Sequence, residues 1–405
     1  MNDYLTDRFP GIGGSIKEVP EDFFVEEIPL YLPSGEGEHL YLTVEKRGVT
    51  TLELLQQMAR ALGVPEREIG YAGLKDARAV SRQTISIPGI RPEQLQAVAI
   101  PGVQLLGAAF HRNKLRTGHL AGNRFRIRIR GVAENALTAA EDILHVLQNV
   151  GAPNYFGEQR YGALANSHYI GRALLRGDFS EAIRQIVGDP AKIVNERWRE
   201  GAERFRAGDL AGALEVMPGR CRDERRLIQA LAGGRSPQEA VLAHPRKLLR
   251  LYLSAYQSSL FDRLVRMRLA TLDILWPGDL AFKHENGACF YVEDAAAEQA
   301  RAERLEISPS GPLFGFKVHL ARGAAGVLEE SLLSKEGVRR EDFRLAGGLA
   351  MEGERRPLRV PLREGSACCE GADLLVSFAL PRGSYATSVL REIMKPATAE
   401  APQPL

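Results

Sequence analysis

A single aspartate among cations is the first feature of this sequence that could carry chemistry. Residues 70–83 read GYAGLKDARAVSRQ, in which Asp76 lies between Lys75 and Arg78 without a histidine, cysteine or second carboxylate. Taken alone, Asp76 is most simply the N-cap of a helix that follows it. The functional alternative is a carboxylate kept ionised by neighbouring cations and acting on a substrate for which one carboxylate suffices.

A run of cations follows further along the chain. Residues 111–130, HRNKLRTGHLAGNRFRIRIR, contain seven lysines or arginines, two histidines and no acid. The alternation within this run predicts a strand whose Phe125, Ile127 and Ile129 face a core while its arginines face away. Such a row can be a solvated face, but protein surfaces normally mix both charges. The missing acids therefore favour contact with a phosphate backbone.

Aromatic residues gather in two further stretches. Residues 154–162, NYFGEQRYG, bring three aromatics close to Arg160. We interpret Tyr155 and Tyr161 first as buried aromatics at a domain junction, although aromatics beside cationic strands can also stack on unpaired bases. Residues 380–392, LPRGSYATSVLRE, predict a turn and then a helix that begins near Tyr385.

The composition bounds the class of protein. A chain of 405 residues can form two or three domains, and 44% hydrophobic with 26% charged residues is ordinary for a soluble globular protein. No apolar run approaches the roughly 20 residues of a membrane helix, and the first residues lack the layout of a signal peptide. Four cysteines without a CxxC pair favour a reducing cytoplasm. The net charge of +2 does not decide for or against nucleic acid, because only its distribution matters.

The elements that must position these residues follow from periodicity and capping. Strand-like segments are 22–32, 39–48, 83–89, 123–131, 288–294 and the first part of 372–392. A capping box at Thr50 and Glu53 predicts a helix that ends before Gly63, and a second helix is predicted over 134–150.

From about residue 163 to about residue 270, the residue pattern is mostly typical of helices. The segments GDFSEAIRQI, from 177, and GDLAGALEVM, from 208, resemble each other. Two copies are too few to establish a helical repeat, so the simpler interpretation is two helices capped by Asp178 and Asp209. Residues 396–405, PATAEAPQPL, predict a disordered tail.

Several familiar chemistries have no motif in this chain. The sequence lacks GxxxxGK, HExxH and GxSxG, and GIGGS near its start does not have the spacing of a dinucleotide fingerprint. The eight histidines are scattered, which predicts no metal site.

Six stretches together resemble one family, the TruD-type tRNA pseudouridine synthases. The matching blocks are IKEVPEDFFVEE (16–27), YAGLKDARAVSRQ (71–83), HRNKLRTGHLAGNRFRIRI (111–129), PNYFGEQRYG (153–162), LSAYQSSLFDRLVRMRL (253–269) and FALPRGSYATSVLRE (378–392). Their order and their spread over most of the chain make the match specific, whereas the GxKDxxA element alone would be weak.

The resemblance implies an α+β fold. A pseudouridine-synthase-like catalytic domain with a mixed, largely antiparallel sheet would be interrupted by a mainly helical α+β insertion, the TRUD domain. The expected boundaries are 1–162 for the N-terminal part of the catalytic domain, 163–350 for the insertion and 351–395 for the C-terminal part.

The resemblance also implies a reaction, the isomerisation of a uridine in tRNA to pseudouridine without a cofactor or metal. The target base must first be flipped out of the RNA. Bacterial members of the family modify uridine 13, which becomes the expected target. The family's essential aspartate falls on Asp76, with Lys17 holding it ionised and Asn123 fixing the local geometry. Phe125 or Tyr385 would stack on the flipped base.

Cations from several stretches are expected to contact the RNA. They are Lys75, Arg78, Lys114, Arg116, Arg124, Arg126, Arg128 and Arg160. The arginine-bearing strand and the inserted domain would form the two walls of an RNA cleft.

Two rival functions belong to other classes. A non-catalytic tRNA-binding or RNA-chaperone protein on the same scaffold would keep the basic strand but tolerate loss of Asp76. A helical-repeat interaction module, suggested by the paired GD segments, predicts no salt-dependent affinity for RNA. The sequence does not fix the oligomeric state, for which a monomer is favoured.

Overall fold

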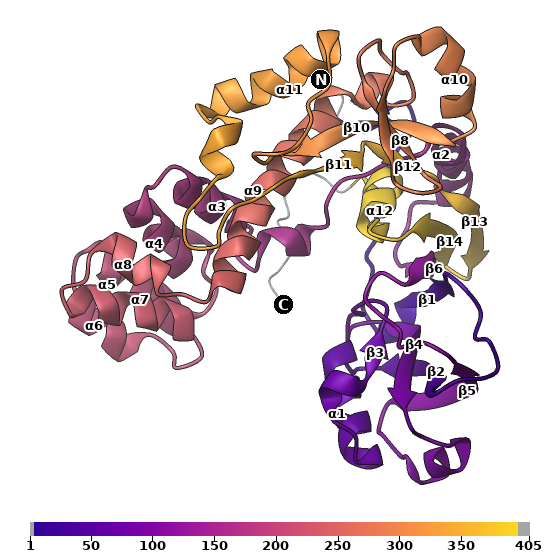
Figure 1. Ribbon diagram of the computed structural model, residues 1–405, viewed down its shortest axis with the longest axis horizontal. Helices are drawn as coiled ribbons and strands as arrows, with labels where there is room; N and C mark the ends of the chain where they lie inside the picture. Colours follow the sequence, from indigo (N-terminus) through magenta and orange to yellow (C-terminus); the bar gives the residue numbers. More distant parts are fainter. Residues whose placement is uncertain (1–3, 396–405) are drawn as a thin grey trace. The chain divides into compact units, whose positions relative to one another are not determined.

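The computed structural model of the protein describes residues 4–395, so the tail predicted over 396–405 lies outside the described residues. The chain forms two compact units (Figure 1). Within the described residues, unit 1 contains residues 4–152 and 360–395, and unit 2 contains Pro153–Arg359. Unit 2 begins ten residues before the insertion expected at 163–350 and ends nine residues after it. The very short strands β7 (Ala152–Pro153) and β12 (Arg359–Val360) stand where the chain passes between the units.

Unit 1 is built on a mixed sheet. Within residues 4–395 this sheet has eight strands, in the order β13-β14-β6-β1-β4-β2-β5 with β3 beside β4. The strands are β1 (Phe23–Pro29), β2 (His39–Arg47), β3 (Gly70–Tyr71), β4 (Val80–Pro88), β5 (Val103–His111), β6 (Leu120–Ile129), β13 (Arg363–Glu370) and β14 (Asp373–Pro381). β1 and β4 run parallel, and the other neighbouring pairs are antiparallel. The predicted mixed, largely antiparallel sheet is confirmed.

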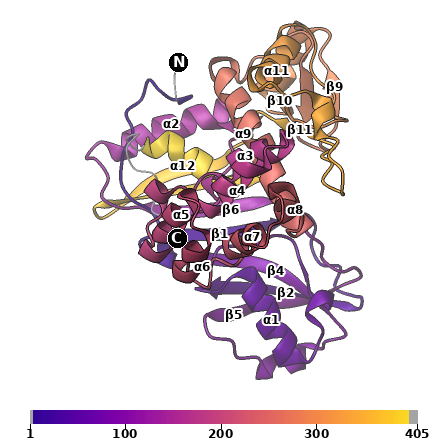
Figure 2. The same ribbon diagram turned by 90° about the vertical axis from the view of Figure 1, so that its left-hand side faces the viewer.

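Three helices cover one face of this sheet. They are α1 (Thr51–Leu62), α2 (Ala136–Val150) and α12 (Ala386–Met394). α2 and α12 lie side by side and bury the half of the sheet that contains Phe125 and Ile127 (Figure 2). α1 forms a second core with Leu40 and Leu42 of β2. We call this side the helical face, and the opposite side, which carries the side chains of Arg124, Arg126 and Arg128, the arginine face.

Local sequence signals set the ends of α1. The hydroxyl of Thr50 accepts a hydrogen bond from the Glu53 amide, and the Glu53 carboxylate accepts one from the Thr50 amide. Gly63 ends the helix with φ of 66°, a left-handed conformation that glycine adopts without a Cβ penalty. The predicted capping box and helix end are confirmed.

Unit 2 combines helices with a smaller sheet. Its helices are α3 (Ser167–Leu175), α4 (Phe179–Val187), α5 (Glu196–Arg206), α6 (Leu210–Val216), α7 (Arg222–Ala232), α8 (Pro237–Leu242), α9 (Arg246–Met267), α10 (Ala295–Glu303) and α11 (Gly323–Glu336). Its strands are β8 (Leu280–Lys283), β9 (Cys289–Tyr291), β10 (Ile307–Leu313) and β11 (Glu354–Pro357), paired in the order β11-β10-β8-β9.

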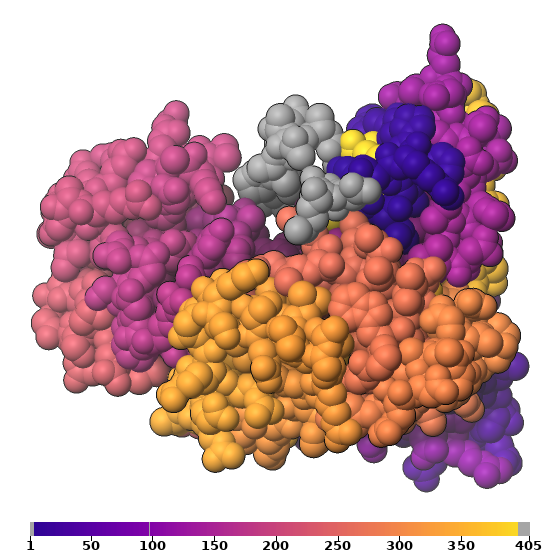
Figure 3. All heavy atoms as spheres, turned by 90° about the horizontal axis from the view of Figure 1, so that it is seen from above, coloured from indigo at the N-terminus to yellow at the C-terminus, as the bar shows by residue number. Residues whose placement is uncertain are grey.

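The long helix α9 joins the two parts of unit 2. It packs against α3 on the helical side and against β10 on the sheet side. Helices α4 to α8 gather into one continuous lobe in the space-filling view (Figure 3). Within it, Asp178 and Asp209 accept hydrogen bonds from the first turns of α4 and α6, as predicted for two capped helices.

The aromatic segment predicted at a domain junction belongs to unit 2. Phe156 donates its backbone N–H to Asp262 of α9, and the Tyr161 hydroxyl donates to the same carboxylate. These contacts with α9 explain why this segment belongs to unit 2, which begins at Pro153. Within the described part of the chain, no helix is both long and apolar enough to cross a membrane, and no group of His, Cys, Asp and Glu side chains could hold a metal ion.

Candidate active site

Asp76 lies in an irregular loop and does not cap a helix. Only a turn at Ala77–Arg78 follows it, and β4 begins at Val80. The helix-cap interpretation is therefore wrong, because residues from Val80 onward pair with β1 and β2 instead of continuing a helical turn. Oδ1 of Asp76 accepts a hydrogen bond of 3.0 Å from the Arg78 amide, the local bond that defines an Asx turn. This bond fixes the orientation of the carboxylate.

Lys17 supplies the cation that contacts Asp76. Its Nζ donates to Oδ2 of Asp76 at 2.8 Å and lies 4.6 Å from the ring centroid of Phe23. The segment before Lys17 is held by a two-way backbone bridge between Ser15 and Arg130. Lys17 itself has φ of 61°, a strained conformation for a residue with a side chain. Such strain concentrates at functional sites, where surrounding contacts stabilise it.

The electrostatics of the loop keep Asp76 ionised. Partial burial raises the pKa of the Asp76 carboxyl, but the hydrogen bonds from Lys17 and Arg78 and the charges of Lys17 and Lys46 outweigh it, so that this pKa lies below its ordinary value. The side chain keeps 31% of its exposure, so a substrate can still reach the carboxylate.

Lys46 is a residue of the site that the sequence reasoning missed. It is fully buried on β2, and its Nζ donates to the backbone carbonyls of Val49 at 2.5 Å, Asp76 at 3.1 Å and Lys75 at 3.3 Å. Burial lowers the pKa of Lys46 to about 8, although the charge of Asp76 partly opposes this shift. A signal was present in the sequence, because Lys46 continues the inward alternation of Leu42 and Val44 where a charge is rare.

The structure does not bring the Lys75 ammonium to the Asp76 carboxylate. Nζ of Lys75 lies 2.7 Å from Oε1 of Glu27 on β1, and both side chains are almost fully buried. The other oxygen of Glu27 accepts from the Thr84 amide of β4 at 3.0 Å. Regular pairing of β1 with β4 ends at Glu26, which leaves these groups to be satisfied by side chains. Lys75 therefore holds the loop through Glu27, whereas Arg78 is exposed and contacts Asp76 through its backbone amide.

Asn123 and Phe125 lie on the same helical face of the sheet. Asn123 is the register partner of Glu27, and Phe125 is that of Val25. The ring of Phe125 packs edge-on against Phe23, at 6.1 Å between centroids, and is only 7% exposed. Within residues 4–395, the buried Oδ1 of Asn123 has no hydrogen-bond donor.

Tyr385 and Arg160 come from other parts of the chain. Tyr385 is the half-buried N-cap residue of α12, so the predicted start of that helix is confirmed. Arg160 belongs to unit 2, where Nε donates to the Ser258 hydroxyl at 2.9 Å and the guanidinium lies over the ring of Phe156.

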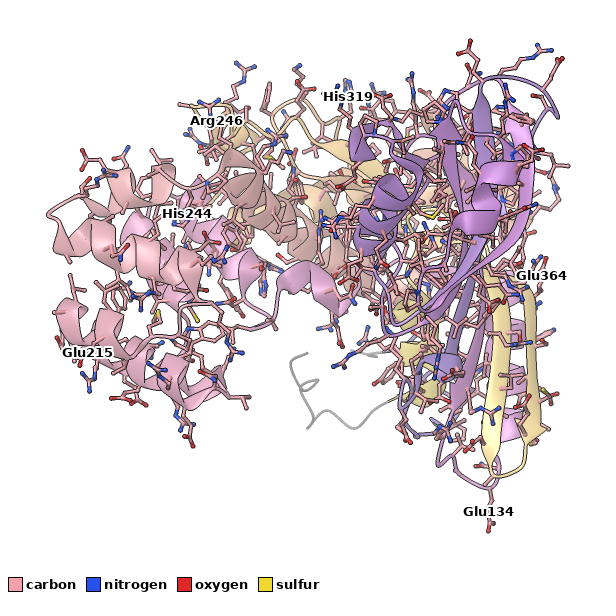
Figure 4. The ribbon with its side chains drawn as sticks, turned by 90° about the horizontal axis from the view of Figure 1, so that it is seen from below. Glu134, Glu215, His244, Arg246, His319 and Glu364 are labelled. Atoms are coloured by element: carbon pink, nitrogen blue, oxygen red, sulfur yellow. The ribbon has the colours of Figure 1, made fainter. Side chains whose placement is uncertain are left out.

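The arginine row of β6 is balanced by acids from neighbouring segments. Arg124 pairs with Glu26 and with Glu364 of β13, which is labelled in Figure 4. Arg128 pairs with Glu370 and lies 3.4 Å from Asp373. This face also lies opposite the helical face on which Asn123 and Phe125 are found. The argument from missing acids is therefore weakened, because tertiary pairing supplies the acids that the run lacks.

Arg126, Lys114 and Arg116 of the basic run have other surroundings than Arg124 and Arg128. Arg126 lies over the ring of Phe24, at 5.2 Å from its centroid. Lys114 and Arg116 stand on the loop between β5 and β6 and line a cavity together with Tyr31 and His119. The Gly118 amide of this loop donates to the carbonyl of Ala72, which ties the loop to the segment that leads to Asp76.

Known proteins resemble this chain over nearly its whole length. Residues 1–393 match the profile of the family described as tRNA pseudouridine synthase D (TruD). The chain therefore belongs to a family of RNA-modifying isomerases.

Individual relatives agree with the family match. A tRNA pseudouridine synthase D from Syntrophotalea carbinolica is 58% identical over 395 residues, covering 98% of this chain and 99% of the relative. One from Geobacter sulfurreducens is 56% identical, covering 97% and 96%. A crystal structure of a TruD protein from Methanosarcina mazei superposes with a TM-score of 0.84 at 27% identity, covering 98% of this chain and 96% of that one. The family is TruD.

Proposed function

We propose that this protein converts a uridine of tRNA, uridine 13, to pseudouridine and that Asp76 is its single catalytic carboxylate. The observation that carries the assignment of Asp76 is its environment. It is an ionised, partly exposed carboxylate, oriented by a backbone amide and paired with Lys17. Full-length similarity to proteins named tRNA pseudouridine synthase D supports the reaction.

The proposed reaction requires one catalytic carboxylate from the protein. The uridine is flipped out of the RNA, and Asp76 either attacks the sugar or assists its deprotonation. The bond between C1′ and N1 then breaks, the uracil turns, and C5 bonds to C1′. Removal of the C5 proton completes the product. If Asp76 attacks C1′, the ester bond it forms breaks again when C5 bonds to C1′. C5 loses one proton and N1 gains one, so the reaction is an isomerisation and needs no redox partner.

Four residues would hold the substrate next to Asp76. Phe125 and Tyr385 are candidates for contact with the flipped base, and the exposed guanidinium of Arg78 suits a phosphate next to the target nucleotide. Oδ1 of Asn123, which lacks a donor within residues 4–395, suits an N–H or hydroxyl group of the bound nucleotide. The cytoplasmic location and the monomeric state stay predictions from the sequence.

The experiment incubates the purified full chain with an unmodified tRNA transcript and maps pseudouridine by chemical probing. We expect product at uridine 13 and none when that uridine is replaced by cytidine. Asp76→Asn should abolish product while leaving the Kd for tRNA within a few fold. Product at another uridine would refute the target while leaving the reaction in place.

Asp189→Asn is a matched control for Asp76→Asn. Asp189 also accepts a hydrogen bond from the amide two residues further on and also pairs with a cation, Arg206. It lies in unit 2, so its replacement should leave the yield of pseudouridine unchanged. Full activity of Asp76→Asn would end the assignment of the catalytic carboxylate. RNA binding without product in the wild-type protein would instead favour the non-catalytic alternative.

A further inference from the structure

A cavity in unit 2 gathers three arginines from three different elements. Its volume is about 440 Å³, and Arg160, Arg250 and Arg356 line it. Arg250 comes from α9, Arg356 from β11 and Arg160 from the short turn Glu158–Tyr161. We call this cavity the three-arginine pocket. It is separate from the Asp76 loop, all of which belongs to unit 1.

The architecture of unit 2 aims these side chains into one space. Arg250, Ser254 and Gln257 follow helical spacing on α9 and share one side of that helix. α9 begins at Arg246, one turn before Arg250 (Figure 4). On β11, Arg356 shares its side of the strand with Glu354, while Arg355 points the other way into a buried ion pair with Glu329.

Phe156 organises two of the guanidinium groups. The Cζ atoms of Arg356 and Arg160 lie 4.4 Å and 5.2 Å from the centroid of its ring. The ring is fixed in turn by an edge-on contact with Phe261, at 5.8 Å between centroids. The aromatic contact holds the plane of each guanidinium. Arg356 also donates to Oδ1 of Asn154 at 2.6 Å, and Arg160 donates to serine hydroxyls. The pocket is therefore preorganised for an anion.

Neutral oxygens position two of these arginines. Arg160 donates to the hydroxyls of Ser254 and Ser258, and Arg250 donates to the carbonyls of Gly348 and Ala350. By contrast, the arginines of β6 in unit 1 are matched by carboxylates. Neutral partners orient a guanidinium without cancelling its charge, so the positive charge of Arg160 and Arg250 is available to a ligand.

Two glutamates also line the pocket. Glu352 is paired with Lys317 at 2.7 Å, so its charge is compensated. Glu354 is exposed and contributes one negative charge against the three arginines. The balance is positive. Leu313 and Met351 add an apolar wall that a sugar can contact.

We propose that the three-arginine pocket binds a phosphate of the tRNA backbone, with the adjoining ribose against Leu313 and Met351. This inference rests on the proposed function and extends it by assigning an RNA contact within unit 2. The planar guanidinium suits phosphate because its donors can form paired hydrogen bonds with two oxygens. Neutralisation of a backbone phosphate also releases a counterion, which makes the affinity depend on salt.

The test measures the Kd of the full-length Asp76→Asn protein for a tRNA transcript between about 50 and 200 mM salt. Arg250→Ala should raise the Kd about five- to tenfold and lower the slope of log Kd against log salt by up to about 0.9, the value for one phosphate contact. Arg160→Ala should act in the same direction. Glu354→Gln should lower the Kd, because it removes the only glutamate in the pocket that is not paired with Lys317.

Arg184→Ala is the matched control, because Arg184 lies in the same unit but is exposed and paired with Glu181. We expect its Kd and salt slope to equal those of the parent protein. Arg250 is also exposed, so its replacement should not disturb folding, which a thermal unfolding curve will verify. An Arg250→Ala protein that is folded and keeps the parent slope would overturn the proposal.

Two further outcomes distinguish free phosphate from a tRNA phosphate as the ligand, and distinguish failure of the pocket proposal from failure of the proposed function. Saturable binding of inorganic phosphate that Arg250→Ala abolishes, together with an unchanged tRNA slope, would mark a free-anion site and overturn the RNA assignment. Pseudouridine formation by the wild-type chain is measured in parallel. Product with an unchanged slope rejects only the pocket, whereas a reduced slope without product supports the pocket and rejects the proposed function.

Discussion

Lys17 and Asp76 form an ion pair with 2.8 Å between Nζ and Oδ2, although 59 residues separate them in the sequence. Lys17 reaches the carboxylate from a strained backbone conformation that the bridge between Ser15 and Arg130 supports. Its ammonium also lies over Phe23, which contacts Phe125. One cation therefore connects the carboxylate to the aromatic core of the helical face.

Removing the Lys17 charge should expose the effect of burial on Asp76. In Lys17→Met, burial acts with less opposition, so the pKa of Asp76 should rise and more of the group should be protonated at acidic pH. We expect the single-turnover rate at pH 6 to fall at least about tenfold, equal to about 1.4 kcal/mol in activation free energy, and to recover partly at higher pH. Lys17→Arg should keep most of the activity. A rate profile from pH 5 to 9 that matches the wild type would contradict this role.

Lys46 predicts an alkaline limit to activity. Its pKa of about 8 means that the ammonium holding the Asp76 loop loses its proton above that pH. We expect kcat/KM to decline above about pH 8, and Lys46→Met to lower activity at every pH and remove this decline. Lys395→Met is the matched control, because Lys395 also donates to two backbone carbonyls, those of Thr6 and Phe9. An alkaline limb that persists in Lys46→Met would assign it to another group.

The same group predicts how stability changes with pH. The pKa of Lys46 falls from 10.5, its ordinary value, to about 8 in the folded protein. Between these values the unfolded chain binds more protons at this group, so its contribution to the free energy of unfolding rises with pH. Lys46→Met should remove this rise. Urea unfolding at pH 7.5 and pH 9.5 compares the two proteins, and an equal pH dependence would show that Lys46 does not titrate in this range.

The buried pair of Glu27 and Lys75 should be costly to break on one side only. Lys75→Met leaves the Glu27 carboxylate buried without its cation, which should lower the free energy of unfolding by about 3–5 kcal/mol. The double variant Glu27→Met and Lys75→Met should lose less. Lys317 and Glu352 provide an exposed pair with the same 2.7 Å separation, and Lys317→Met should cost at most about 1 kcal/mol. Additive losses in the double variant, measured by urea unfolding, would argue against coupling.

Replacement of Asn123 should lower activity without lowering the free energy of unfolding. Because its buried Oδ1 has no donor within residues 4–395, Asn123→Ala should leave the free energy of unfolding within about 0.5 kcal/mol of the wild type or raise it. The single-turnover rate should still fall by about tenfold or more. Asn154→Ala is the control, since Asn154 bonds to Pro357 and Arg356 and should lose about 1–3 kcal/mol. A large loss of stability in Asn123→Ala would reveal a structural role.

Cations of the basic run should differ in their contribution to RNA binding. Arg128 is paired with Glu370 and Asp373, so Arg128→Ala should leave the salt slope of tRNA binding unchanged. Arg116 is exposed on the loop between β5 and β6, and Arg116→Ala should lower the slope by up to about 0.9 if it contacts one phosphate. Fluorescence anisotropy over a salt series measures both. A lower slope for Arg128→Ala would place the arginine face in contact with RNA.

Local signals were sufficient for much of the secondary structure. The cap at Thr50, the cap at Asp178 and the inward alternation of β6 each depend on residues a few positions apart, and each prediction is confirmed. The interpretation of Asp76 alone as a helix N-cap failed for the opposite reason. Val80 to Arg82 pair with Phe24 to Glu26 of β1. The residues near Asp76 carry no local signal for pairing with a strand that lies more than 50 positions earlier in the sequence.

The sequence by itself determined many of the helices and strands, the family and the candidate carboxylate, because capping, periodicity and the order of the six blocks can be read from the chain alone. Tertiary structure decided which charges meet. In the folded chain, Lys17 pairs with Asp76 and Lys75 pairs with Glu27. Lys46 donates to the backbone carbonyl of Asp76, and Arg124 of β6 pairs with Glu364. The physical reason is that an ion pair depends on distance in space, and strand pairing brings together side chains that the sequence separates.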